Sequence, residues 1–104
     1  MSYSVIFSPE AEEQLVGLYR YVAKAASSET AKEFTDAIIK HCEELKSFPQ
    51  RGTLREDIRP GLRITHFKKR TIIAFAIMDE NVVILSIYYG GQNFEEKLND
   101  DAQL

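Results

Sequence analysis

The stretch LRITHFKKRTIIAFAIMDENVVILSIYY, residues 62–89, decides the fold of this chain. Three runs within it, 62–67, 71–78 and 82–89, are rich in β-branched and aromatic residues, which are enriched in β-strands. Short polar segments, Lys68-Lys69-Arg70 and Asp79-Glu80-Asn81, separate the runs and are typical of hairpin turns. The stretch therefore predicts three consecutive antiparallel strands.

Immediately upstream, Pro60-Gly61 predicts the turn from which these strands begin. Proline fixes φ at the first central position of a type II turn, and glycine accepts the positive φ that the second position requires. Downstream of the turn, the runs 71–78 and 82–89 are apolar on both faces, so both faces of the sheet should be covered. Two helices can cover one face, and we expect a partner segment to lie across the other.

Residues 1–50 predict one strand and two helices. Alternating apolar residues over 3–7 indicate a strand with one buried face. Ser8 is a good N-cap and Pro9 suits the first helical position, so a helix is expected from about residue 9 to 25. A second apolar stripe of helical spacing follows Ser27-Ser28 and should end before Phe48-Pro49.

The resulting order is β-α-α-β-β-β. It predicts an α+β fold in which a helical hairpin packs on a mostly antiparallel four-stranded sheet. The 104 residues suit one domain, 1–104, and the polar end of the chain, 95–104, is expected to be a frayed acidic tail after a short helical turn.

Composition limits the setting of the protein. The longest apolar run, 72–78, is far shorter than a membrane-spanning helix, which favours a soluble protein. The chain opens without a secretory signal pattern, and Cys42 has no second cysteine to pair with, so a cytoplasmic location is expected. Cys42 lies within a helical apolar stripe and is interpreted as a packed core residue.

Charge is strongly segregated along the chain. Residues 51–70 hold seven cations against two anions, a net charge of +5, although the whole chain carries −3. The remaining residues therefore carry −8. An acidic chain of this kind is not typical of a protein that coats nucleic acid, but its basic segment can attract one acidic partner.

The basic segment supplies the predicted partner-binding residues. Part of this set is expected to bond the free carbonyls at helix C-termini, and the rest to meet carboxylates of an acidic protein, which arginine pairs with in a two-pronged way. The predicted set is Arg51, Arg55, Arg59, Arg63, Lys68, Lys69 and Arg70.

An enzymatic alternative uses an overlapping set. Cleavage of RNA through its 2′-hydroxyl needs a base, an acid and cations around the phosphate. The candidates are Arg63, His66, Lys68, Arg70, Tyr88 and Tyr89. Most of them also have a structural interpretation. Lys68 and Arg70 lie in a charged hairpin turn, and His66 shares its strand face with Leu62 and Ile64 and is expected to be partly buried. Tyr88 and Tyr89 are expected to face opposite ways, with at least one of them in the core. No metal or cofactor motif is present in the sequence.

Several short segments, taken in order, are similar to a known toxin family. They are SPEAEEQL (8–15), FPQRG (48–52), IRPGLR (58–63) and a last strand that runs into Gly90. Over roughly residues 3–94 the chain resembles the ParE branch of the ParE/RelE toxins of bacterial type II toxin-antitoxin systems. The resemblance implies two helices against a curved antiparallel sheet. It also implies a role in plasmid stabilisation, growth inhibition by binding DNA gyrase, and neutralisation by a small acidic antitoxin in a hetero-oligomer.

One motif departs from the family pattern. Members commonly end the last strand in a stretch like His-Gly-x-Arg-Asp, whereas this chain has Tyr89-Gly90-Gly91-Gln92-Asn93, with Gln92 in place of the arginine. The sequence leaves three functions open. They are a gyrase-binding toxin, a RelE-like ribosome-dependent endoribonuclease, and a partner-binding domain without toxicity.

Overall fold

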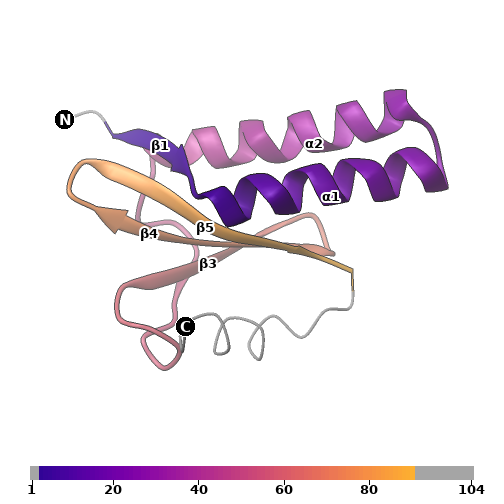
Figure 1. Cartoon of the computed structure of the whole chain (residues 1–104). Coiled ribbons are helices and arrows are strands. Elements are labelled where there is room, and N and C mark those ends of the chain that lie inside the picture. Colours follow the sequence, from indigo (N-terminus) through magenta and orange to yellow (C-terminus); the bar gives the residue numbers. More distant parts are fainter. Residues whose placement is uncertain (1–2, 91–104) are drawn as a thin grey trace.

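The computed structural model describes residues 3–90, and its elements follow the predicted order (Figure 1). The helices are α1 (Pro9–Ala25) and α2 (Ser28–Glu43), and the short 3₁₀ helix η1 (Glu44–Lys46) follows α2. The strands are β1 (Ser4–Phe7), β2 (Thr53–Leu54), β3 (Leu62–Phe67), β4 (Thr71–Met78) and β5 (Asn81–Tyr89). The predicted α+β fold is confirmed. The predicted acidic tail, 95–104, lies outside the described residues.

The strands form one sheet in the order β1-β5-β4-β3-β2. β1 pairs parallel with β5, and the other pairings within residues 3–90 are antiparallel. The predicted strand number was wrong by one, because β2 was not expected. This strand has two residues, with Thr53 opposite Ile64, and so short a segment has no alternating pattern that the sequence could reveal.

Both helices begin at a serine that caps their first turn. Ser8 Oγ accepts a hydrogen bond from the Ala11 N–H at 3.0 Å and donates one to the Leu85 carbonyl at 2.9 Å. Ser27 Oγ accepts from the Thr30 N–H at 3.0 Å. Ser8 therefore starts α1 and also fixes its first turn against β5. None of the helices in residues 3–90 is long and apolar enough to cross a membrane.

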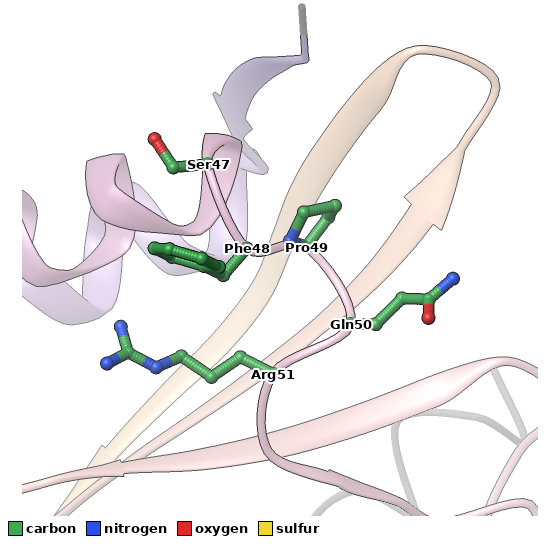
Figure 2. Close-up of a pocket in the computed structure, with 5 residues that line it drawn as sticks. All are labelled: Ser47, Phe48, Pro49, Gln50 and Arg51. Atoms are coloured by element: carbon green, nitrogen blue, oxygen red, sulfur yellow. The ribbon is translucent and has the colours of Figure 1, made fainter. Parts of the chain in front are cut away.

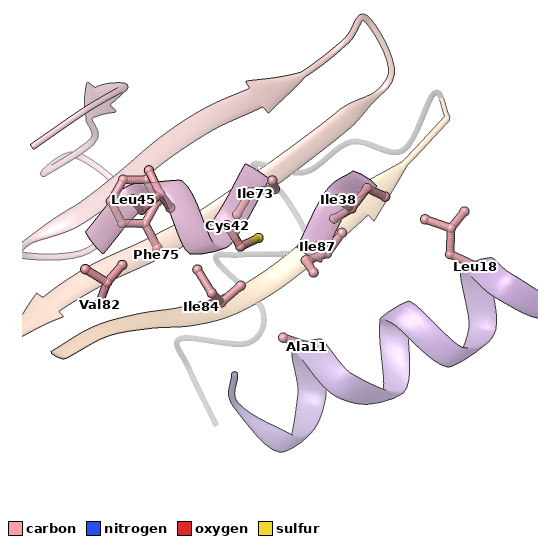
Figure 3. Packing of buried hydrophobic residues seen from close by; sticks show 10 residues of the cluster. All are labelled: Ala11, Leu18, Ile38, Cys42, Leu45, Ile73, Phe75, Val82, Ile84 and Ile87. Carbon is pink, nitrogen blue, oxygen red and sulfur yellow. The ribbon is translucent and has the colours of Figure 1, made fainter. Parts of the chain in front are cut away.

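The main core lies between the helical hairpin and one face of the sheet, which we call the helix side (Figure 3). Its largest side chains are fully buried and come from both layers. The helical layer contributes Ile38 of α2 and Leu45 of η1, and the sheet contributes Ile73, Phe75 and Ile84. Cys42 is also fully buried here, which confirms its predicted packing role. Burial raises the pKa of the Cys42 thiol to about 12, so the thiol stays protonated at neutral pH.

The opposite face of the sheet, the distal face, carries a smaller apolar cluster. Leu62, Ile64, Ala74 and Tyr88 are buried there, and Ile58 from the loop before β3 packs against them. The chain itself thus covers more of this face than the sequence predicted. Two large apolar side chains nevertheless remain well exposed. They are Ile6 in β1, at 45%, and Met78, the last residue of β4, at 44%.

Side chains of α1 cover the part of β5 that extends past β1. Beyond Phe7 the outer edge of β5 has no strand beside it among the described residues, and its backbone donors need other partners. Gln14 Oε1 accepts from the Ile87 N–H at 2.6 Å, and Glu10 Oε2 accepts from the Ser86 hydroxyl at 3.1 Å. The amphipathic helix therefore contributes polar contacts to the sheet edge as well as apolar contacts to the core.

Candidate partner-binding site

The basic segment, residues 51–70, follows the β3 edge of the sheet. It comprises the loop after η1, β2, the turn before β3, β3 itself and the turn into β4. The predicted turn is confirmed: Gly61 has φ 76°, and the Leu62 N–H donates to the Arg59 carbonyl at 3.1 Å. The Glu56 carboxylate also accepts from the Gly61 N–H at 2.8 Å. The cations of the segment lie in the loops and turns that flank β3, apart from Arg63, which is in β3 itself.

Two of the predicted arginines have structural partners. The Arg63 guanidinium donates to the Gln50 carbonyl at 2.8 Å, which ties the loop after η1 to β3. Arg55 forms a two-pronged ion pair with Asp57, with N–O distances of 2.9 and 2.8 Å, and this pairing lowers the pKa of the Asp57 carboxyl. These partners are a loop carbonyl and a carboxylate, rather than the carbonyls at helix C-termini that were expected.

The other predicted cations are exposed to solvent. These are Arg51, Arg59, Lys68, Lys69 and Arg70. Lys68 adopts φ 56° in the β3–β4 turn, and its ammonium nitrogen lies 5.5 Å from the centre of the Phe67 ring. Such a contact holds the charge above an aromatic face without removing it from water. The turn role predicted for residues 68–70 is confirmed, and the cations remain accessible to a partner.

Gly52 brings the loop after η1 close to β3. Its φ is 81°, and a Cβ at this position would lie 2.3 Å from the Ile64 carbonyl oxygen. A side chain would therefore clash with the backbone and would also be strained by the positive φ. This geometry explains the glycine of the FPQRG segment, because a larger residue would push the loop off the sheet.

Phe48 and Arg51 project from the same loop into an open hollow of about 590 Å³, lined by residues 47–51 (Figure 2). Phe48 is 67% exposed, although it is a large apolar side chain. Figure 2 shows its ring and the Arg51 side chain extending in the same direction alongside α2. An exposed aromatic ring and a guanidinium in one hollow suit a partner that has both apolar and acidic groups.

The loop that lines the hollow is bound to β3, because the Arg63 guanidinium donates to the Gln50 carbonyl. Arg63 pairs with the core residue Phe75, and Leu54 pairs with Arg63, so all three side chains share this face. Phe67 lies further along β3 on the same face. We call the surface between α2 and β3 the seam, and define it by Phe48, Arg51, Leu54, Arg63, Phe67 and Lys68.

His41 of α2 lies close to two residues of the seam, Phe67 and Arg51. Its ring centre lies 5.3 Å from that of Phe67, and its Nε2 atom is buried without a hydrogen-bond partner among the described residues. Burial lowers the pKa of His41, the nearby Arg51 charge lowers it further, and Glu44 acts in the opposite direction. His41 is therefore a packing residue, and its lowered pKa favours the neutral imidazole in the folded state.

The alternative nuclease residues are divided between the two faces of the sheet. Tyr89 packs against the helix-side core, and Arg63 shares that face. Tyr88 is buried in the distal cluster, and His66 lies on the distal face by strand alternation. The prediction that Tyr88 and Tyr89 face opposite ways, with at least one in the core, is confirmed. Side chains on opposite faces of one sheet cannot surround a single phosphate.

The expectation that His66 is partly buried was wrong. Its strand face was predicted correctly, but the side chain is exposed. β2 pairs with β3 only as far as Ile64, so His66 has a neighbouring strand on one side, with Ile72 opposite it on β4. A residue near the open end of an edge strand has too few neighbours to be buried.

Sequence reasoning missed the apolar part of the seam. Phe48 and Leu54 were not considered as binding residues, because large apolar side chains are usually assigned to the core. One signal was available. Phe48 precedes a proline and lies between a helix and a glycine-containing loop, where there is no periodic apolar face for it to join.

Comparison with known proteins now assigns the family. Residues 5–94 match the family described as "ParE toxin of type II toxin-antitoxin system, parDE". The chain belongs to this ParE toxin family. No curated protein matches the chain.

Solved structures share the fold of this ParE-family chain at low sequence identity. One is the chromosomal ParDE toxin-antitoxin system from P. aeruginosa, with a TM-score of 0.75, 18% identity, and coverage of 84% of this chain and 95% of that chain. Another is the toxin-antitoxin complex RelBE2 from Mycobacterium tuberculosis, with a TM-score of 0.62, 19% identity, and coverage of 86% and 100%. A mutant of the E. coli toxin RelE in the free state has a TM-score of 0.68, 15% identity and complete coverage of both chains.

Both branches of the toxin superfamily are thus represented among the structural neighbours of this ParE-family protein. At identities below 20% these likenesses show the fold alone. β5 ends at Tyr89, and Gly90 follows with φ 79°. The departure from the family motif at Gln92 lies outside the described residues.

Proposed function

We propose that this ParE-family chain is the toxin of a type II toxin-antitoxin module, that it arrests growth by binding DNA gyrase in the cytoplasm, and that a small acidic antitoxin neutralises it in a hetero-oligomer. The family match over residues 5–94 carries this proposal. We further propose that the whole chain, 1–104, acts as one toxin domain and that the module stabilises the plasmid that encodes it.

The distribution of charge supports binding to an acidic protein. Arg51, Arg59 and Lys69 are exposed along the β3 edge, in a chain whose other segments are acidic. Exposed cations of this kind raise association rates with an oppositely charged surface and suppress contact with like-charged ones. The partner-binding set is therefore proposed to consist of these exposed cations, while Arg55 and Arg63 shape the surface that presents them.

Binding is favoured over RNA cleavage because the candidate catalytic groups do not converge. General acid-base chemistry requires donor and acceptor within hydrogen-bond reach of one reacting group. Here Tyr88 is buried on the distal face, whereas Arg63 lies on the helix side. The candidates that share a face are also apart: His66 and Tyr88 are separated by the β4 residue Ile72. On the helix side, Arg63 lies opposite Phe75 of β4, whereas Tyr89 lies opposite Thr71 at the other end of that strand.

Induced expression in bacteria followed by two separate assays tests the proposal. We expect growth arrest, loss of plasmid supercoiling and intact transcripts. Lys69→Glu should reduce the arrest, and Lys24→Glu, at an exposed lysine near the end of α1, is the matched control that should not. Cleaved transcripts with normal supercoiling would replace gyrase binding with the endoribonuclease function. Normal growth on expression would leave only a partner-binding domain.

A further inference from the structure

The outward face of α1 carries a stripe of residues that does not contribute to the core. Leu18 is buried, and helical spacing places Glu13, Gly17 and Arg20 on the opposite side of the helix. Val16 lies beside Gly17 and is 49% exposed, although its side chain is apolar. All four residues of this surface are exposed, and we call them the α1 stripe: Glu13, Val16, Gly17 and Arg20.

Gly17 is the least expected residue of the α1 stripe. Glycine is among the weakest helix formers, yet Gly17 lies at the middle of the seventeen residues of α1. A Cβ at this position would meet nothing within 4 Å beyond its own turn of the helix, so no contact with the rest of the described chain requires a glycine there. A missing side chain does let the backbone of another helix approach closely. The position therefore points to a contact with a molecule outside this chain.

The charges of the α1 stripe are arranged symmetrically about its centre. Glu13 and Arg20 lie at equal distances on either side of the Val16-Gly17 pair, with the carboxylate toward the start of α1 and the guanidinium toward its end. The two residues are two helical turns apart, about 10 Å along the axis, which is too far for an ion pair within one helix. Neither side chain takes part in the ion pairs formed among residues 3–90. Both charges are therefore available to a partner.

We propose that the α1 stripe is the contact through which two copies of this chain associate. The two α1 helices lie antiparallel about a twofold axis that passes between Val16 and Gly17. In this arrangement Glu13 of each copy faces Arg20 of the other, and each Val16 side chain packs over the other copy's Gly17. One self-complementary surface thus supplies both halves of the interface. The inference is independent of the proposed function, because it requires neither an antitoxin nor gyrase.

A uniformly charged partner would fit this surface poorly. Glu12 and Glu13 line an open hollow of about 670 Å³ on the first turns of α1, together with Pro9, Val16 and Arg20. An acidic protein or a nucleic acid would be attracted by Arg20 but repelled by the two carboxylates, and a basic partner would experience the reverse. A second copy in the antiparallel orientation offers each end of the stripe the opposite charge. It is therefore the occupant that the charges favour.

The size of the contact limits its strength. One pair of helices buries less surface than the roughly 1,200 to 2,000 Å² of a stable protein interface, so the association should be weak. We expect a dissociation constant on the order of 0.1 to 1 mM, which leaves the chain monomeric at about 10 μM. Melting experiments at low concentration therefore report on the monomer. Because the ion pairs lie at the surface, the association should weaken as salt is raised.

Sedimentation equilibrium of the purified chain from about 10 μM to about 1 mM provides the test. We expect a reversible equilibrium between monomer and dimer. Glu13→Arg and Arg20→Glu should each weaken the association about tenfold or more, because each places like charges opposite one another. An equimolar mixture of these two variants should associate again, since every facing pair then joins an acid with a base. Gly17→Gln should weaken the dimer about tenfold, because its side chain would hold the two helices apart.

A matched control and a folding measurement make the test decisive. Lys40→Glu reverses an exposed charge on α2 rather than on α1, and should change the association less than about twofold. Circular dichroism of each variant should match that of the original chain, which separates a loss of association from a loss of folding. A chain that is monomeric at every concentration would overturn the inference. So would an association that both charge reversals leave unchanged, or a mixture of the two reversed variants that fails to associate. None of these results depends on whether the chain inhibits gyrase.

Discussion

The helix-side core and the seam use the same kinds of side chain on the same face of the molecule, but in opposite ways. Phe75 is fully buried beneath the helical hairpin, whereas Phe48, just past the end of η1, is 67% exposed. The core excludes water and stabilises the fold. The seam keeps Phe48 and Leu54 accessible, and polar and backbone contacts position the loop that carries Phe48. We therefore expect that stability and binding can be perturbed separately in this small protein.

Replacing a phenylalanine by alanine in each of the two regions should give the largest contrast in the free energy of unfolding. Phe75→Ala should lower the free energy of unfolding by about 3 to 5 kcal/mol, because it leaves a large cavity in a closely packed core. Phe48→Ala should change it by less than about 0.5 kcal/mol, since the ring is mostly in water already. Urea denaturation measures both. Similar losses for the two variants would mean that the seam is part of the core.

Gly52→Ala tests the link between the regions. A methyl group here would meet the Ile64 carbonyl at 2.3 Å in a backbone conformation that disfavours it, so we expect a loss of about 2 kcal/mol. The loop should also move away from β3. Urea denaturation measures the loss. Unchanged stability would show that the loop is not held by this contact.

For His41, which lies between the core and the seam, we expect a smaller effect on the free energy of unfolding that depends on pH. Its folded-state pKa lies below the ordinary value of 6.5, so the unfolded chain binds more protons than the folded chain near that pH. The stability that neutral His41 contributes is complete above 6.5 and is lost as the pH falls through the folded-state value. On acidification, the unfolding free energy of the original chain should therefore fall relative to that of His41→Leu. A difference that is constant from pH 8 to 5 would contradict the assignment.

Gly17→Ala should produce the smallest change, and in the stabilising direction. Gly17 lies in the middle of α1 and is exposed, and a methyl group added there would meet nothing within 4 Å beyond its own turn of the helix. Alanine in an exposed helix interior is favoured over glycine by about 0.5 to 1 kcal/mol. Thermal melting should show a modest rise in Tm. A decrease would indicate that this face of α1 is packed against something in solution.

Local patterns predicted the regular elements well. The N-cap at Ser8 with Pro9 after it placed the start of α1 correctly, and Pro60-Gly61 placed the turn before β3. These signals act over a few residues, so the sequence contains all the information that they need. β2 was missed because its pairing with Ile64 depends on a contact between segments about ten residues apart, with no periodic pattern of its own.

The site was predicted only in part, for a related reason. The concentration of cations in residues 51–70 is visible in the sequence, and so is the turn that contains Lys68. Some arginines form hydrogen bonds within the chain, and the folded structure decides which ones, because it brings their partners close. Arg63 meets the Gln50 carbonyl thirteen residues away, and nothing in the local pattern distinguishes it from Arg59. The exposure of Phe48 likewise follows from the path of its loop.

We propose that the basic edge of this ParE-family chain binds a protein and does not break a covalent bond. The most direct measurement is the supercoiling rate of purified DNA gyrase as a function of the concentration of the purified chain. We expect inhibition that saturates as the concentration of the chain rises, that is weaker for Lys69→Glu and that is unchanged for Lys24→Glu. An unchanged supercoiling rate at every concentration, together with cleavage of messenger RNA on ribosomes by the same preparation, would contradict it.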